Sequence, residues 1–252
     1  MPIVSTISVT PVKGFVLLHP ESVELTDVGV VENRRFLLVD GSGLRLRSSL
    51  TAWPIHVRGE YDSEAERLRM RFPDGAVIEG SAAAGGDRIT VDYHGRAVEA
   101  QIVDGDWTSR LSELAGHPVR LARPDRPGEC QAEPVTLVSE ASIARLEREA
   151  GRGVDGRRFR MLFTLSGCRE HEEDTWAGGL LRIGGAVVRA GGPVPRCAVT
   201  TRDPDTGERD LDTLRLIKDY RGVRDGEAID FGVYAAVEQP GRVRVGDPVE
   251  PL

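Results

Sequence analysis

The sequence predicts an α+β fold that is mostly β, in which short strands form barrel-like domains and a few helices pack on them. Two observations lead to this prediction. Most of the chain consists of short segments in which apolar and polar residues alternate, and this alternation is the period of a half-buried strand. Turn sequences such as Asp40-Gly41-Ser42-Gly43 and Pro73-Asp74-Gly75 separate these segments. Many short strands joined in this way are typical of a closed or rolled barrel.

Residues 1–120 are expected to form one domain of short strands. A helix is predicted at residues 106–114, with Asp106 as its N-cap and Gly116 as its C-terminal glycine. Residues 121–130 are rich in Arg, Pro, Asp and Gly, which predicts a linker or surface loop. The expected strands cover residues 3–9, 22–25, 35–40, 55–61, 67–72, 76–79 and 88–91.

Residues 121–252 are expected to form a second domain of strands with two helices. Ser139 is the predicted N-cap of the first helix, whose Ile143 and Leu146 lie on one face. The second helix is expected at residues 211–220. The expected strands cover residues 134–138, 158–165, 180–183, 186–189, 198–201, 231–237 and 242–249.

The composition is that of a soluble globular protein. The chain has 252 residues, of which 40% are hydrophobic and 29% charged, and its formal net charge is −7. This charge argues against a general nucleic-acid-binding protein, although a local basic pocket is compatible with it. No apolar run approaches a membrane span, and the N-terminus lacks the pattern of a signal peptide. Three cysteines are too few for a disulfide framework, so we expect a cytoplasmic protein.

Common catalytic motifs are missing from the sequence. It contains no Walker phosphate loop, Rossmann glycine fingerprint, nucleophile elbow or zincin helix. The run His171-Glu172-Glu173-Asp174 resembles a metal-binding segment, but no second histidine follows four residues after the first. A solvated acidic loop is the preferred interpretation of this run.

Cys197 lies in the segment Pro193-Val194-Pro195-Arg196-Cys197. Two prolines stiffen this segment, and the adjacent guanidinium favours the thiolate form, which attacks electrophiles and binds soft metals. The alternative is a buried, inert cysteine, and the local chemistry by itself favours that alternative.

Basic residues suggest a second possible site. Only two of the 33 basic residues are lysines, and one of them, Lys13, follows a proline-containing turn. Convergence of lysine and arginine side chains on one pocket would suit a phosphorylated ligand, whereas the alternative is a dispersed, solvated surface. The arginines at strand ends or in tight loops are Arg34, Arg35, Arg157, Arg158, Arg160 and Arg196.

Several motifs occur together in a characteristic order. They are Pro11-Val12-Lys13, Asn33-Arg34-Arg35-Phe36, Leu137-Val138-Ser139-Glu140-Ala141-Ser142, Arg158-Phe159-Arg160, Glu173-Asp174-Thr175-Trp176, Arg196-Cys197, Thr200 to Gly207, Phe231-Gly232-Val233-Tyr234 and Val245-Gly246-Asp247-Pro248-Val249. In this order the chain resembles MOSC-domain proteins that carry an N-terminal MOSC β-barrel domain, such as the mitochondrial amidoxime-reducing component and its bacterial homologues. The resemblance covers nearly the whole chain.

This resemblance implies an N-terminal β-barrel-like domain, residues 1–120, packed on a C-terminal MOSC β-barrel, residues 121–252. It also implies a molybdenum cofactor between the two, with no haem or iron–sulfur cluster in this chain. Cys197 matches the cysteine whose thiolate coordinates molybdenum, and Lys13 and Arg35 match residues that hold the pterin phosphate. The other cofactor-contacting positions implied are Arg160, Arg196 and Ser139.

The resemblance further implies a two-electron reduction of amidoximes, hydroxylamines and N-oxides, with Asp174 among the catalytic residues. A separate electron-transfer protein would supply the electrons, and the protein would be a monomer that binds neither nucleic acid nor membranes. Two alternatives are a sulfur carrier with a persulfide on Cys197, and a diverged protein of specialised metabolism that works without molybdenum.

The chain departs from the family pattern at a few positions. Met161-Leu162 replace a proline and an asparagine, Gly14 replaces a serine, and Pro195 replaces a small polar residue. The threonine–glutamine signature of the N-terminal barrel appears here as Arg47-Ser48-Ser49, without the amide. Each replacement removes a hydrogen-bonding group that could contribute about 1 kcal/mol or more to binding a buried anion.

Overall fold

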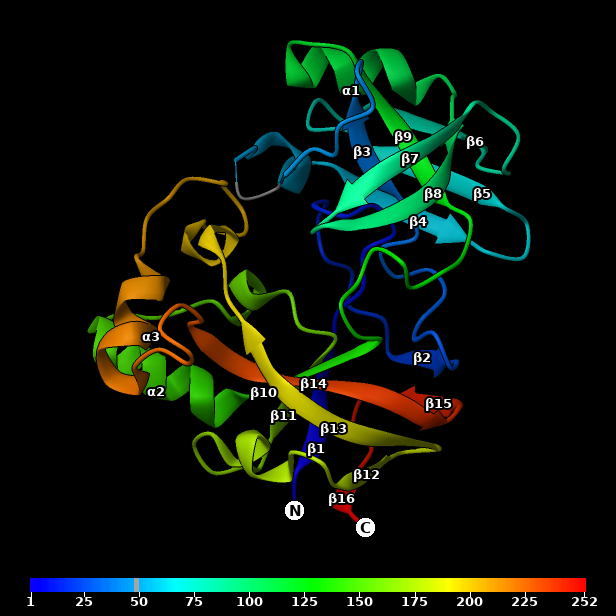
Figure 1. Cartoon of the computed structure of the whole chain (residues 1–252). Coiled ribbons are helices and arrows are strands. Elements are labelled where there is room, and N and C mark those ends of the chain that lie inside the picture. The colour runs from blue at the N-terminus through cyan, green and yellow to red at the C-terminus, as the bar shows by residue number, and fades with distance from the viewer. Residues whose placement is uncertain (48–49) are drawn as a thin grey trace. The chain divides into compact units, whose positions relative to one another are not determined.

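The computed structural model describes residues 1–47 and 50–252 and consists of two compact units (Figure 1). Unit 1 comprises Met1–Val9, Leu18–Val30 and Glu133–Leu252, and unit 2 comprises Thr10–Leu17 and Val31–Ala132. Ser48 and Ser49, where one departure from the family pattern falls, lie outside the described residues. The expected division into domains at residues 120 and 121 stays a prediction.

Unit 1 is built on a seven-stranded sheet. The neighbouring strands are antiparallel except for β10 and β11, which are parallel. In spatial order the strands are β1 (Ile3–Ile7), β11 (Phe163–Ser166), β10 (Val135–Ser139), β14 (Asp230–Gln239), β13 (Ala186–Pro195), β12 (Leu180–Ile183) and β16 (Val249–Pro251).

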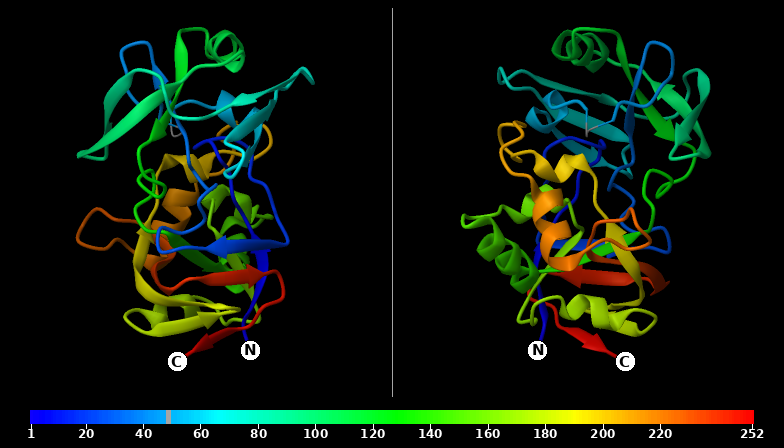
Figure 2. Two further views of the ribbon diagram at one scale, coloured as in Figure 1. Left: turned by 90° about the vertical axis from the view of Figure 1, so that its right-hand side faces the viewer. Right: turned by 60° about the vertical axis from the view of Figure 1, so that its left-hand side comes forward.

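The two edges of this sheet meet. Ile3 in β1 forms a bridge with Pro248, just before β16. The backbone N–H of Val4 donates to the carbonyl of Asp247 (2.9 Å), and the N–H of Gly246 donates to the carbonyl of Val4 (2.8 Å). The sheet is therefore nearly closed, and both termini lie side by side (Figure 2).

Two helices cover a second apolar cluster of unit 1. The helices α2 (Glu140–Ala150) and α3 (Thr213–Arg221) lie next to each other (Figure 1), and Ile143, Leu146 and Ile217 are buried there. The predicted N-cap of α2 is confirmed, because the Ser139 hydroxyl accepts a hydrogen bond from the N–H of Ser142 (3.1 Å). The remaining elements are the strand pair β2 (Ser22–Leu25) and β15 (Gly241–Arg244) and the 3₁₀-helices η2 (Gly156–Phe159), η3 (Glu172–Trp176) and η4 (Ala198–Thr201).

Unit 2 has two smaller sheets and the third α-helix of the described residues, α1 (Trp107–Ala115). Alternation explains its strands: in β5 (Arg67–Arg71), Leu68 and Met70 are buried while the three arginines that alternate with them are exposed. One sheet contains β3 (Leu37–Asp40), β9 (Val119–Pro124), β8 (Arg96–Val103) and β7 (Arg88–Tyr93), and the other β4 (Arg58–Asp62), β5 and β6 (Val77–Ser81); η1 (Trp53–His56) precedes β4.

The prediction of an α+β, mostly β fold is confirmed. Asp106 precedes α1 as predicted, although its side chain makes no capping hydrogen bond, and Gly116 ends the helix with a φ of 72°. No helix in the described residues is both long and apolar enough to cross a membrane.

Several local predictions were wrong. Residues 242–249, expected to be one strand, divide into β15 and β16, which belong to different sheets, with a turn between them. The predicted linker at 121–130 begins inside β9, where Leu121 and Ala122 are buried and pair with both β3 and β8. Residues 158–165, expected to be one strand, divide into η2 and β11. Residues 198–201 form η4 instead of a strand, because the N–H of Thr200 donates to the carbonyl of Cys197 (3.1 Å) and closes a turn.

Candidate functional site

Cys197 lies where β13 ends and η4 begins, and its side chain is exposed. Its carbonyl accepts hydrogen bonds from both the N–H and the hydroxyl of Thr200, each at 3.1 Å. The same hydroxyl contacts that of Thr213 at the start of α3 (2.7 Å). The backbone of Cys197 is therefore held while its thiol is accessible. The alternative of a buried cysteine is wrong for Cys197, although Cys130 is such a residue.

Arg196 ties this position to the neighbouring elements of unit 1. Its Nε donates to the carbonyl of Phe231 in β14 (2.9 Å), and its NH1 donates to the carbonyl of Phe159 at the end of η2 (3.2 Å). The guanidinium lies 5.3 Å from the centre of the Phe159 ring. These contacts to backbone oxygens and an aromatic face fix the residue next to Cys197.

Arg160 belongs to the same neighbourhood because it directly follows Phe159. It has a φ of 50°, a left-handed conformation that is uncommon for arginine and that ends η2. The next two residues, Met161 and Leu162, are buried, and the N–H of Leu162 donates to the Thr136 hydroxyl (2.8 Å). Leu162, which stands where the family pattern has an asparagine, thus puts a buried apolar side chain in place of a polar one.

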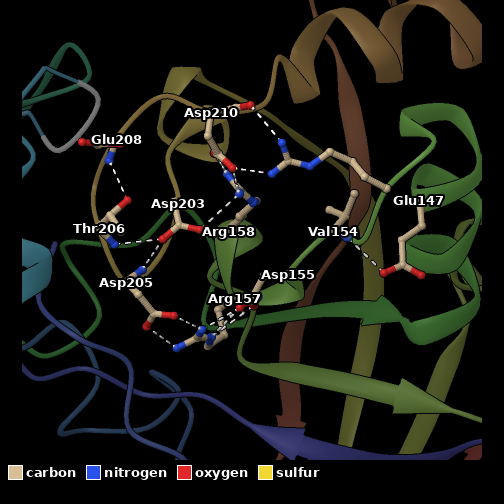
Figure 3. A network of polar contacts seen from close by, with 11 residues as sticks. Glu147, Val154, Asp155, Arg157, Arg158, Asp203, Asp205, Thr206, Glu208 and Asp210 are labelled. Atoms are coloured by element: carbon tan, nitrogen blue, oxygen red, sulfur yellow. Dashed lines mark hydrogen bonds and ion pairs between the residues drawn. The ribbon is translucent and has the colours of Figure 1, made fainter.

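The loop that follows Cys197, residues 202–210, is held by arginines from η2 and from the turn before it (Figure 3). Arg158, whose side chain is 2% exposed, pairs both guanidinium nitrogens with the Asp210 carboxylate at 2.7 and 2.8 Å. Arg157 donates to Asp205 at 2.9 and 2.7 Å. Charge pairs between segments far apart in the sequence therefore set the geometry of this loop. Arg158 and Asp210, for example, are separated by 52 residues.

Ser139 and Glu173 form a separate, buried group at the start of α2. Both residues are 0% exposed. Glu173 Oε1 accepts hydrogen bonds from the N–H of Ser139 (3.1 Å) and from the hydroxyl of Ser142 (2.7 Å). Glu173 Oε2 has no hydrogen-bond partner among the described residues. The interpretation of residues 171–174 as a solvated acidic loop was wrong, because Glu173 is the anion that caps α2.

Asp174 lies near the other end of α3. Its Oδ2 accepts from Arg221 (2.6 Å), the last residue of that helix, and Arg221 also contacts Nδ1 of His171. Nε2 of His171 lies 3.2 Å from the hydroxyl of Tyr220. Burial, together with the charge of Arg221, lowers the pKa of His171 to about 4, so this ring is neutral at physiological pH. Asp174 and the turn of Cys197 thus contact opposite ends of α3.

Lys13 and Arg35 are neighbours in unit 2. The N–H of Lys13 donates to the carbonyl of Phe36 (2.9 Å), and its Nζ donates to the Tyr93 hydroxyl (2.6 Å). Arg35 is 5% exposed, and its NH1 donates to the carbonyl of Pro124 (2.6 Å). Burial, followed by the charge of Arg123, lowers the pKa of Arg35. Arg35 is thus a buried cation beside a second cation and bonded to a neutral oxygen, an environment that an anion would stabilise.

The predicted site residues therefore fall into three groups. Cys197, Arg196 and Arg160 share one neighbourhood in unit 1, and Lys13 and Arg35 share one in unit 2. Ser139 and Asp174 lie elsewhere in unit 1. No group of three or more His, Cys, Asp or Glu side chains in the described ranges could hold a metal ion.

Comparison with known proteins identifies the family. Residues 105–250, more than half of the chain, match the MOSC domain. The chain belongs to the MOSC domain family.

Curated MOSC relatives match part of this chain. Mitochondrial amidoxime reducing component 2 of Bos taurus is 39% identical over 123 residues, which are 46% of this chain and 36% of that protein. Mitochondrial amidoxime-reducing component 1 of Danio rerio is 30% identical over 183 residues, which are 64% of this chain and 55% of that protein. The chain thus spans about a third to a half of the length of these relatives.

Two solved structures are also similar. The YuaD protein of Bacillus subtilis aligns over 99% of this MOSC chain and 94% of its own, with 12% identity and a TM-score of 0.44. YiiM of Geobacillus stearothermophilus aligns over 48% of this chain and 54% of its own, with 20% identity and a TM-score of 0.34.

Sequence reasoning missed two features of the site. It did not recognise Glu173 as a buried cap, because a glutamate in an acidic run, two residues after His171, carries no local signal of burial. It also did not identify the pairs between Arg157 or Arg158 and the loop 202–210. Two adjacent arginines and a loop with three aspartates are complementary in charge. The local sequence does not show which arginine pairs with which aspartate.

Proposed function

We propose that this MOSC protein binds a molybdenum cofactor and is an oxidoreductase that reduces N-hydroxylated or N-oxide-type substrates. A separate electron-transfer protein would supply the electrons. The observation that carries the proposal is the exposed thiol of Cys197, presented on a backbone that Thr200 and Arg196 hold in place. The names of the curated relatives, amidoxime reducing components, support this class of reaction.

The residues present suit this cofactor. A cysteine thiolate is a soft ligand appropriate to molybdenum, and Cys197 is accessible for that role. Lys13 and the buried Arg35 would hold the pterin phosphate, because charge-assisted hydrogen bonds to phosphate are strong and the acceptor that Arg35 contacts, the carbonyl of Pro124, is neutral. Arg196 and Arg160 would line the cofactor position on the side of Cys197.

When bound, the cofactor supplies the two-electron redox chemistry of the reaction. The overall change breaks the N–O bond of the substrate, consumes two electrons and two protons, and releases water. The protein supplies position and environment for this change. Cys197 provides the metal ligand, Arg196 fixes that ligand relative to β14 and η2, and the buried Met161 excludes water beside the guanidinium.

The resemblance implies a catalytic role for Asp174 and a cofactor contact for Ser139, but both side chains are engaged in contacts within unit 1. The Ser139 hydroxyl caps α2, and Asp174 pairs with Arg221, so each side chain already holds a structural partner. We propose a positioning role for both: Ser139 fixes the start of α2 and Asp174 the end of α3, the helix whose Thr213 contacts Thr200 in the segment after Cys197.

Metal analysis of protein expressed with abundant molybdate tests the proposal. The expected result is near-stoichiometric molybdenum that is lost in Cys197→Ala and retained in Cys168→Ala, the matched control at a half-buried cysteine of the same unit. Lys13→Ala and Arg35→Ala should lower the amount of cofactor retained. Full molybdenum content in Cys197→Ala would contradict the proposal.

A sulfur carrier is the second candidate, because an exposed thiol on a fixed backbone also suits a persulfide. Protein without molybdenum but with cyanide-releasable sulfur that Cys197→Ala abolishes would favour this function. Neither signal, in a folded protein, would favour a diverged MOSC protein that works without molybdenum.

A further inference from the structure

Three cations surround one tyrosine ring in unit 2. The Arg45 guanidinium carbon lies 4.8 Å from the centre of the Tyr93 ring, Lys13 Nζ lies 5.0 Å from it, and the Arg96 guanidinium carbon lies 5.7 Å from it. The three residues come from separate segments: the turn after β1, the turn after β3 and the start of β8. We call Lys13, Arg45, Arg96 and Tyr93 the Tyr93 cluster.

The two arginines of this cluster have no charged hydrogen-bond acceptor among the described residues: Arg45 contacts Nε2 of His94, and Arg96 contacts backbone carbonyls. Lys13 donates to the Tyr93 hydroxyl and to the carbonyl of Cys130 (3.2 Å), and Arg96 donates to the carbonyls of Glu129 and Gln131. The Nε of Arg45 is buried without a hydrogen-bond partner in the described part of the chain. The Tyr93 phenol is neutral, since burial raises its pKa to about 12.

No carboxylate forms an ion pair with Arg45 or Arg96 among residues 1–47 and 50–252. The acid nearest in sequence to the contacted carbonyls, Glu129, directs its carboxylate to the N–H of Arg126 (3.1 Å). Other arginines of unit 2 are paired: Arg88 with Asp125 at 2.6 Å, and Arg67 with Glu79 at 3.0 Å. The Tyr93 cluster thus concentrates positive charge in a chain whose net charge is −7.

The pKa of the neighbouring His94 is lowered in part by the same positive charges. Burial lowers the pKa of His94, and the charges of Arg45, Lys13 and Arg47 lower it further. Cations placed this close repel one another, and an anionic ligand would remove that repulsion while supplying the charged acceptors that the guanidinium groups lack.

We propose that Lys13, Arg45 and Arg96 form a binding site for a ligand with two linked phosphate groups, of the diphosphate ester class. Each guanidinium fork matches one phosphate bidentately, and the ammonium of Lys13 acts as a point charge between them. The inference rests on the proposed function, in which Lys13 holds a phosphate. It extends that function, because two guanidinium groups and an ammonium exceed what a single phosphomonoester needs.

Calorimetric titration with inorganic phosphate and with pyrophosphate tests the proposal. It uses the 252-residue chain, expressed without added molybdate, at constant ionic strength. Pyrophosphate is expected to bind at least about tenfold more tightly than phosphate, since it engages a second charge-assisted fork. Arg45→Gln and Arg96→Gln should each reduce pyrophosphate affinity about tenfold and change phosphate affinity by no more than about threefold.

Arg88→Gln is the matched control, because Arg88 lies in the same β7–β8 hairpin as Arg96 but pairs with Asp125. Its pyrophosphate affinity should equal that of the unmodified protein, and thermal melting should show all variants folded. Equal affinities for the two anions, or an equal loss in Arg88→Gln, would overturn the inference. The molybdenum content tests the proposed function separately. If the protein prefers pyrophosphate but never retains molybdenum, the proposed function is refuted and the diphosphate site is still supported.

Discussion

Glu173 is a buried carboxylate that holds the start of a helix. It accepts from the N–H of Ser139 and the hydroxyl of Ser142, and it is 0% exposed. We expect Glu173→Ala to lower the free energy of unfolding by about 2–4 kcal/mol, because two buried donors lose their acceptor. Urea denaturation measures this change. The control is Glu170→Ala, an exposed residue paired with Arg148, which should cost less than about 1 kcal/mol; equal losses would contradict the capping role.

His171 should make the stability depend on pH. Its pKa in the folded protein is about 4, below the ordinary value of 6.5, so the unfolded chain binds more protons between these values. Stability is therefore complete above about pH 6.5 and is lost as the pH falls toward 4. The measurement is the urea midpoint as a function of pH.

His171→Asn should flatten that profile between pH 6.5 and 4. Asparagine is the conservative choice because it tolerates the left-handed φ of 55° at this position. The exposed His117→Asn serves as the control and should leave the profile unchanged. A profile that keeps its full slope in His171→Asn would show that another group causes it.

At the scale of elements, the loop 202–210 depends on η2 for its position. The pair Arg158–Asp210 is nearly excluded from solvent on the arginine side, whereas the pair Arg152–Asp210 is half exposed. We expect Arg158→Ala to cost about 1.5–3 kcal/mol of unfolding free energy, because the partly exposed Asp210 loses its buried charged donor and keeps only Arg152. Arg152→Ala should cost less than about 1 kcal/mol.

The same pair of variants tests whether the ion pair between Arg158 and Asp210 orders the segment after Cys197. Limited proteolysis should cleave Arg158→Ala within residues 202–210 faster than Arg152→Ala. Resistance equal to that of the unmodified protein in both variants would mean that the loop is held by other contacts.

Elements with a periodic pattern were predicted well. Residues 22–25 and 180–183 match β2 and β12, and the helices with caps at Ser139 and Gly116 occur where expected. The elements around the site were predicted less well. Residues 198–201 contain β-branched side chains typical of a strand, yet Thr200 bonds back to Cys197 and to α3. Contacts outside the local sequence therefore overrode strand propensity.

At the scale of the whole molecule, unit 1 joins the beginning of the chain to its end. The N–H of Gly246 donates to Val4 across this junction, and the φ of Gly246 is 91°. Gly246→Ala should lower the free energy of unfolding by about 1–2 kcal/mol, the usual cost of this conformation for a residue with a Cβ. Gly192→Ala is the control.

The two glycines are matched in the space around them and differ in backbone conformation. An added Cβ meets no atom within 4 Å at either position, but Gly192 has no positive φ. Alanine at residue 192 should therefore leave stability unchanged or raise it slightly. Equal effects of the two substitutions in chemical denaturation would show that backbone conformation at the junction is not the cause.

The sequence by itself determined the β-rich class, the helix caps and the family, because strand alternation, capping residues and ordered motifs are properties of neighbouring residues. It also identified Cys197, Lys13 and Arg35 as candidate residues. Only the tertiary structure decided which side chains are exposed, which are buried and which charges are compensated. Cys197 is accessible, Glu173 is enclosed, and Arg96 beside Tyr93 donates to neutral carbonyl oxygens. These properties depend on partners far apart in the chain, such as Arg158 and Asp210, and no local pattern specifies such a pairing.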